Sequence, residues 1–213
     1  MLILTFKGLW ARKRRLVGTL VAVFLGVSFL SGALALGDTL RGNFDQLFAN
    51  ANAGTDAVVR SATTLESGPR NDRTLIPASI VSQVRTVGGV ADAQPLMMGF
   101  GQLIGSDGKA IGGMGPPRIA SNWIGDPALN PYHLASGRAP LADDEVVINQ
   151  GAANSGHLHL GQTTTVQVPQ PVTVRIVGIA TFGTANGFGQ ATYTAFSLAG
   201  AERYISGRPD QIT

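Results

Sequence analysis

The stretch ARKRRLVGTLVAVFLGVSFLSGALALGD, from Ala11 to Asp38, joins a basic cluster to a long apolar run that ends at an acidic residue. The run from Leu16 to Gly37 carries no charged residue, and as a helix it would measure about 33 Å. A bilayer has a hydrocarbon core about 30 Å thick. A buried helix of a soluble protein usually shows a polar stripe, and hydroxyl groups are the only polar interruptions here. We therefore predict a transmembrane helix over residues 16–37.

A cleaved export signal is the main alternative to this anchor. The segment Ala33-Leu34-Ala35 fits the small-residue cleavage pattern, and the basic segment before Leu16 fits the start of a signal peptide. The apolar core of a signal peptide, however, measures roughly 7 to 15 residues, which is shorter than this run. Length favours a retained anchor, whereas cleavage after Ala35 would release a secreted soluble protein.

The charges on either side of the run predict its orientation. Five basic residues precede it without an acid (Lys7, Arg12, Lys13, Arg14 and Arg15), and Asp38 follows it at once. Because basic loops stay in the cytoplasm, residues 1–15 are expected to form a cytoplasmic, amphipathic basic tail. Residues 38–213 are then extracytoplasmic, and the chain is a single-pass protein of the inner or plasma membrane. This larger part holds 11 of the 16 basic residues against all 13 acids, so we expect no nucleic-acid partner.

The first part of the extracytoplasmic segment mixes helix and strand signals. Cysteine is absent from the chain, which excludes disulfides and thiol chemistry. Apolar residues at helical spacing predict that the membrane helix continues as a stalk. The pair Asp107-Gly108, which suits a tight turn between two strands, predicts a hairpin. The expected order is a helical stalk at 39–53, a strand at 57–60, a loop at 61–74, a helix at 77–87, extended chain at 90–104, a hairpin turn at 106–109 and a returning strand at 110–115.

The second part is mostly strand. Gly and Pro turns separate runs of β-branched residues that alternate with period two. A loop over residues 116–132 precedes them. We expect strands at Glu145–Asn149, Thr163–Val168, Val172–Ile179 and Ala191–Thr194, with short helices at 151–158 and 198–204. The fold class is therefore α+β: one N-terminal transmembrane helix followed by a mixed α/β extracytoplasmic domain of two lobes, the second mostly β.

Four short motifs carry a resemblance to a known family. They are Gly137-Arg138-Ala139-Pro140, Glu145-Val146-Val147, the segment from Ala152 to Gly161 with Gln162, and Ile176-Val177-Gly178-Ile179. With a basic tail and one anchor before them, they resemble the extracytoplasmic core domain of FtsX/MacB-type ABC transporter permeases. The resemblance extends from Phe6 to Ile212. Turn and strand chemistry accounts for these motifs without any site, so their first role is to specify the fold.

The resemblance implies a non-catalytic permease component that couples a separate cytoplasmic ATPase to extracytoplasmic export or mechanotransmission. The implied partners are that ATPase, a second permease or a second copy of the chain, and membrane lipid. Full permeases of this type carry further membrane helices after the ectodomain. We expect this chain to be an N-terminal fragment, a split or truncated product, or a stand-alone relative. A membrane-tethered binding module that recruits envelope proteins is the alternative.

Catalytic and metal-binding patterns are incomplete. His157 and His159 would share one face of a strand, but without cysteine they do not complete a ligand set. Side chains of Asp143, Asp144 and Glu145 alternate in direction on a strand and are expected to face solvent. There is no Gly-Lys-Ser/Thr phosphate loop and no Gly-x-Ser-x-Gly elbow. We therefore assign no catalytic, cofactor or metal residue and do not expect an enzyme.

Two apolar, glycine-containing stretches suit a contact surface for a lipid-like substrate or a partner ectodomain. The first is Leu96 to Phe100 and the second is Phe182 to Gly189. The candidate contact residues are Met97, Met98, Phe100, Phe182 and Phe188. The alternative is that these side chains belong to the hydrophobic core.

Overall fold

A computed structural model of the chain describes residues 13–51, 54–63, 74–112, 117–183, 185–187, 190–206 and 211–212. The chain divides into two compact units, Met1–Ala49 and Asn50–Thr213. We refer to them as the helical unit and the β unit.

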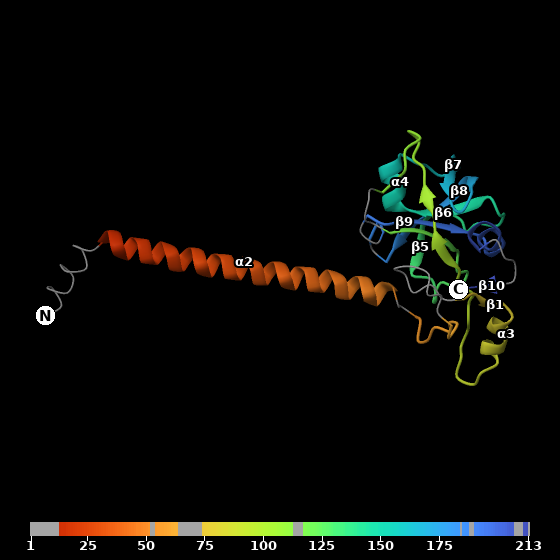
Figure 1. The fold of residues 1–213 in the computed structure, drawn as a ribbon, viewed down its shortest axis with the longest axis horizontal. Helices are drawn as coiled ribbons and strands as arrows, with labels where there is room; N and C mark the ends of the chain where they lie inside the picture. Colours follow the sequence, from red (N-terminus) through yellow and green to blue (C-terminus); the bar gives the residue numbers. More distant parts are fainter. Residues whose placement is uncertain are drawn as a thin grey trace. The chain divides into compact units, whose positions relative to one another are not determined.

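Helix α2 runs without a break from Lys13 to Ala51, over 39 residues (Figure 1). Within it, Val17–Thr39 is long and apolar enough to cross a membrane, with a mean hydropathy of 2.2. Its side chains are exposed along this whole stretch; Leu20 and Phe29, for example, are 70% and 80% exposed. A core helix of a soluble protein would bury them, at a gain of about 25 cal/mol per Å². The predicted stalk is confirmed as helix as far as Ala51; residues 52–53 lie outside the described residues.

The β unit is built on an eight-stranded mixed sheet. Its order is β2-β4-β9-β6-β8-β7-β3, with β5 also paired to β8. The strands are β2 (Met98–Phe100), β3 (Gln102–Leu103), β4 (Arg118–Asn122), β5 (Tyr132–Gly137), β6 (Glu145–Asn149), β7 (Thr163–Gln167), β8 (Pro171–Phe182) and β9 (Thr192–Phe196). The pairs β4–β9 and β6–β8 are parallel, and the others are antiparallel.

Strands β6 and β8 hold the centre of this sheet. All five residues of β6 are buried, as expected for a strand with a neighbour on each edge and cover on both faces. Strand β8 is long enough to serve three partners: its first half pairs with β7, its middle with β6 and its end with β5. The fully buried side chains at the centre of the sheet include Val146 and Ile148 of β6, Ile176 of β8 and Phe196 of β9.

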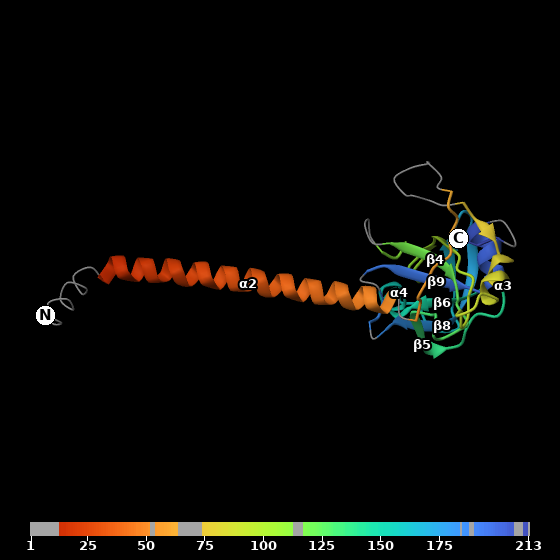
Figure 2. The ribbon, with the colours of Figure 1, turned by 90° about the horizontal axis from the view of Figure 1, so that it is seen from below.

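Short helices close the ends of the β unit. Helix α4 (Gln150–Gly156) follows β6 and ends at His157, whose φ of 49° is left-handed. Helix α5 (Leu198–Ala201) starts at Ser197, whose hydroxyl accepts a bond from the Gly200 N–H, and continues as a π-helix, η1 (Glu202–Ser206). Helix α3 (Ile80–Arg85) lies beside the two-stranded pair of β1 (Ile76–Pro77) and β10 (Gln211–Ile212). Figures 1 and 2 both place α3 and α4 at opposite ends of the β unit.

The structure confirms the α+β class and most strands of the second lobe, and it corrects several details. Strands from both predicted lobes lie in one sheet and cluster as one unit. No strand forms at 57–60, and the helix predicted over 77–87 begins only at Ile80. Strands β4 and β5 were missed because Pro and Asn residues nearby indicated a loop. The hairpin at 106–109 is confirmed, whereas only Ala110 of the returning strand pairs, with Ile104; residues 113–116 lie outside the described residues.

Candidate functional site

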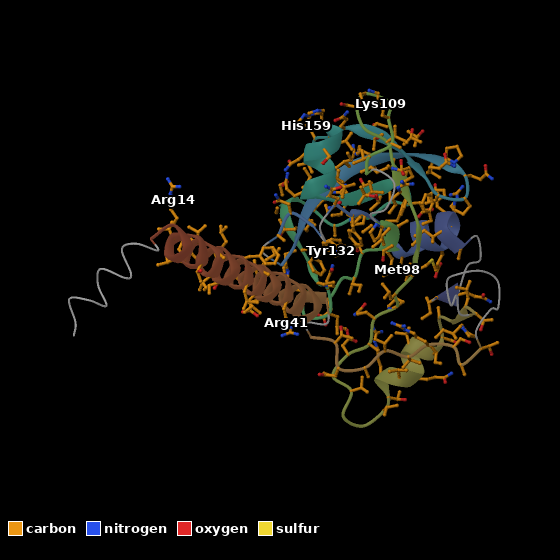
Figure 3. The ribbon with its side chains drawn as sticks, turned by 60° about the vertical axis from the view of Figure 1, so that its left-hand side comes forward. Arg14, Arg41, Met98, Lys109, Tyr132 and His159 are labelled. Atoms are coloured by element: carbon orange, nitrogen blue, oxygen red, sulfur yellow. The ribbon has the colours of Figure 1, made fainter. Side chains whose placement is uncertain are left out.

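The candidate contact residues do not all reach the surface. Met97 is fully buried and Phe182 is 4% exposed, so both belong to the core. Met98 and Phe100 are 49% and 46% exposed. Phe188 lies outside the described residues. Of the candidate contact residues, Met98 and Phe100 are therefore the two that are described and exposed; Met98 is labelled in Figure 3.

The position of β2 explains this division. Met97 lies just before the strand, where its N–H donates to the Asn122 side chain and its carbonyl accepts from the Asn122 N–H. Gly99 faces the π-helix, where an added Cβ would lie 2.5 Å from Ile205 Cγ2. Because side chains alternate along a strand, Met98 and Phe100 share the opposite face. Phe100 lies directly across from Ile119 of β4.

Phe182 belongs to a buried aromatic cluster at the end of β8. Tyr132 and Tyr193 stack with ring centroids 3.7 Å apart, and Phe182 meets Tyr132 edge to face at 5.1 Å. Burial raises the pKa of both tyrosines, so they stay neutral phenols. Asn149 lies next to this cluster: its side chain donates to the Ala191 carbonyl and accepts from the Tyr193 N–H. These contacts hold the end of the segment that joins β8 to β9.

The three predicted surface acids have three different environments. Asp144 is exposed, as expected, and Asp143 pairs with Arg203 at 3.4 Å. Glu145 is only 7% exposed, which corrects the expectation that it faces solvent. The three carboxylates therefore do not form one site.

Glu145 is the centre of an ion cluster that we call the arginine clamp (Arg138, Glu145 and Arg175). Both Nη atoms of Arg138 donate to the carboxylate, one of them at 2.7 Å, and Arg175 Nη2 donates at 3.1 Å. The Leu141 N–H adds a bond of 3.0 Å. These bonds, from Arg138 first and then from the Leu141 backbone, hold the pKa of Glu145 well below its usual range.

The arginine clamp joins three strands of the sheet: Arg138 is 7 residues from Glu145 along the chain, and Arg175 is 30 residues from it. Arg138 follows β5, Glu145 opens β6, and Arg175 lies in β8 directly beside Glu145 in the parallel register. The sequence patterns singled out Arg138 as a motif residue and Glu145 as a motif residue and an acid expected to face solvent, and Arg175 was missed. Arg175 could not be predicted because its position beside Glu145 depends on the pairing of β6 with β8. The alternating pattern of a strand does not show which strand it pairs with.

The histidine pair has no third ligand in the part of the chain that the structure describes. His157 caps α4 and His159 follows two residues later, and both are exposed. Figure 3 shows His159 and Lys109 at one end of the β unit. There the 105–110 hairpin meets α4 through a bond from the Ser106 N–H to the Gly156 carbonyl. Among the described residues, no group of three or more His, Cys, Asp or Glu side chains is placed to hold a metal ion.

Comparison with known proteins assigns the family. The family model of the MacB-like periplasmic core domain matches residues 16–213. The chain belongs to this family. It is thus an ABC transporter permease-type chain with a periplasmic-type domain and, within its described residues, one helix suited to a membrane. Among solved structures it is similar to the periplasmic region of MacB from Actinobacillus actinomycetemcomitans, with 13% identity and a TM-score of 0.48, over 72% of this chain and 69% of that one. A search of curated protein sequences finds no significant match.

Proposed function

We propose that the chain is a non-catalytic permease component of an ABC transporter, which couples a separate cytoplasmic ATPase to work on the extracytoplasmic side. Family membership supports the transporter context. The observation that carries the coupling role is the unbroken helix α2, which continues from the candidate span to Ala51. A continuous helix transmits displacement or rotation, whereas a flexible linker would absorb it.

The proposed topology follows from charge and length. We place residues 1–15 in the cytoplasm, residues 16–37 in the membrane and residues 38–213 outside, because the basic cluster lies entirely before the span. The small residues Gly18, Gly26 and Gly32 leave open space beside the helix. In a membrane, such positions let a second helix approach closely. A second permease or a second copy of the chain is therefore the expected partner within the bilayer.

The test is reconstitution with the ATPase and permease encoded beside this chain. The complex is purified in mild detergent, placed in vesicles, and its ATPase rate is measured with and without the chain. Assembly of the complex and a changed rate would support the proposal. If the chain purifies as a lone monomer while the ATPase assembles and turns over normally without it, a membrane-tethered binding module becomes the better interpretation. Mature protein beginning at Leu36 would instead support the secreted form.

A substitution in the stalk tests coupling separately from assembly. Gly42 lies in the part of α2 beyond the candidate span, and a Cβ added there would have no atom within 4 Å. Proline at this position breaks or kinks a helix, whereas alanine strengthens it. Gly42→Pro is expected to leave the complex assembled and to abolish the effect of the chain on ATPase rate, and Gly42→Ala is the matched control. Equal rates in the two variants would contradict rigid coupling.

We also propose that Met98 and Phe100 contact a partner ectodomain. Their exposure on one face of a terminal strand supports this. The double substitution Met98→Ser/Phe100→Ser is expected to weaken co-purification with the partner permease, and Val58→Ser/Val59→Ser, at a second exposed apolar pair, is the control. Equal weakening by both pairs would argue against a specific surface.

A further inference from the structure

A surface hollow of about 320 Å³ lies beside the middle of β8. Strand β7 pairs with the first part of β8 and β5 with its last part, so neither strand covers Ile176 and Val177 on this edge. Turns supply the backbone bonds there: the Gly161 N–H donates to Ile176 and the Arg138 N–H to Val177. The hollow is lined by Gly137, Arg138, Leu160, Gly161, Arg175, Ile176 and Val177. Its volume is at the lower end of the range for small-molecule sites, about 300–1,000 Å³.

An exposed apolar strip runs from this hollow, where Leu160 is a lining residue, to Leu134 next to it. Leu134 and Leu160 are 39% and 48% exposed. They lie against Gly137 and Gly178, which face each other across β5 and β8. A Cβ on Gly137 would lie 2.6 Å from Leu160, and one on Gly178 would lie 2.9 Å from Leu134. The paired glycines thus make room for two leucines on the sheet surface.

The rim of the hollow carries positive charge. The arginine clamp sums to one net positive charge, because two guanidinium groups share the single carboxylate of Glu145. The side chains of Arg138 and Arg175 are 45% and 55% exposed. Among the described residues, the Arg175 guanidinium makes one hydrogen bond, from Nη2 to Glu145. Its other N–H groups remain able to donate to a ligand. A carboxylate, sulfate or phosphate group could accept hydrogen bonds from these N–H groups.

We propose that this hollow binds a single-chain amphiphile with an anionic head group. The head group lies on Arg175, and the hydrocarbon chain lies along Leu160 and Leu134. The apolar strip disfavours an acidic peptide, and the arginines disfavour an uncharged chain. The site goes beyond the proposed coupling role and does not depend on it.

Photolabelling of the full chain tests this proposal. The chain is placed in nanodiscs of zwitterionic phosphatidylcholine and exposed to a long-chain carboxylic acid that carries a diazirine in its alkyl chain. Crosslinked peptides are located by mass spectrometry. We expect saturable labelling of peptides containing Leu160 and Ile176. The matched alcohol, with the same chain but no charge, is expected to label α2 through the bilayer and to leave the hollow unlabelled. Labelling of α2 is thus an internal standard for both probes.

Two substitutions locate the determinants. Labelling is compared at the probe concentration that half-saturates the unaltered chain. There, Arg175→Gln is expected to reduce labelling of the hollow at least about fivefold, because the head group loses a charge-assisted hydrogen bond. Leu160→Asn is expected to act in the same direction. Arg85→Gln is the matched control, since Arg85 is 47% exposed and also pairs with one carboxylate. A native near-UV circular dichroism spectrum and a cooperative thermal transition well above the assay temperature confirm that each variant folds, because Arg175→Gln also removes one bond of the arginine clamp.

Three outcomes would overturn the proposal. They are equal labelling of the hollow by the acid and the alcohol, full labelling in Arg175→Gln, and labelling confined to α2. Displacement of the probe by a glutamate-rich peptide, with no saturation by the fatty acid itself, would assign the surface to an acidic polypeptide. None of these outcomes touches the ATPase assay, so the two proposals fail independently.

Discussion

Helix α2 and the β unit satisfy their polar groups in opposite ways. In α2 the backbone bonds are local, the Thr39 hydroxyl donates back to the Ala35 carbonyl at 2.8 Å, and the apolar side chains of Val17–Thr39 are exposed. In the β unit, Glu145 accepts a bond from Arg175, 30 residues away, and the Thr164 hydroxyl donates to the Ile104 carbonyl, 60 residues away. A chain with local partners is suited to cross a membrane, where no water completes the bonds. The β unit instead depends on a few long-range contacts.

The sharpest test of this contrast is removal of the Glu145 carboxylate. Glu145→Ala deletes charge-assisted bonds from two arginines and leaves the Leu141 N–H without its acceptor. We expect a loss of about 3 kcal/mol in the free energy of unfolding of the β unit, measured by urea titration followed by near-UV circular dichroism. Asp144→Ala removes the neighbouring exposed acid and is expected to change stability by less than about 0.5 kcal/mol. Similar losses in both variants would show that net charge, rather than the clamp, is responsible.

Glycine-to-alanine substitutions compare the two units directly. At Gly178 an added Cβ would lie 2.6 Å from the Arg138 carbonyl oxygen, and backbone cannot easily yield. We expect Gly178→Ala to cost about 2 kcal/mol, in the range for overpacking. At Gly26 no atom lies within 4 Å, so Gly26→Ala is expected to leave the isolated chain as stable or more helical. If Gly26→Ala instead abolishes co-purification with the partner permease, a second helix packs against that face.

The same distinction explains what could be predicted from the sequence. The apolar run, its charge boundary and the continuation to Ala51 follow from local composition, and the structure shows one continuous helix there. Strand β6 was predicted with its observed bounds because five consecutive residues carry the signal. The arginine clamp needs the register of β6 on β8, and the surface position of Met98 but not Met97 needs the pairing of β2. Register is a property of two segments, and neither one encodes it alone.

A pH titration isolates the clamp without mutation. Because the pKa of Glu145 is lowered in the folded state, its contribution to stability is complete above the unfolded value, about 4.3, and is lost as pH falls below it. We expect a thermal midpoint that is flat between pH 7 and pH 5 and falls below about pH 4. The fall is expected to be smaller than the loss in Glu145→Ala, because a protonated carboxyl still accepts hydrogen bonds. In Glu145→Gln the thermal midpoint should fall less between pH 5 and pH 3. If the fall is the same as in the unaltered chain, it comes from other carboxylates such as Asp92, whose pKa is also lowered.

The smallest expected effect comes from a local rule that operates inside the β unit. His157 ends α4 with a φ of 49°, and it is the only non-glycine residue with positive φ among the described residues. Its N–H is bonded to the Asn154 carbonyl, so the left-handed turn closes the helix. Glycine adopts this conformation without the strain of a Cβ. His157→Gly is therefore expected to raise the free energy of unfolding by about 0.5–1 kcal/mol, whereas His159→Gly, at an exposed position without positive φ, should lower it slightly. A loss of stability in His157→Gly would mean that the imidazole makes a favourable contact which outweighs the strain, and would reopen the histidine pair as a binding site.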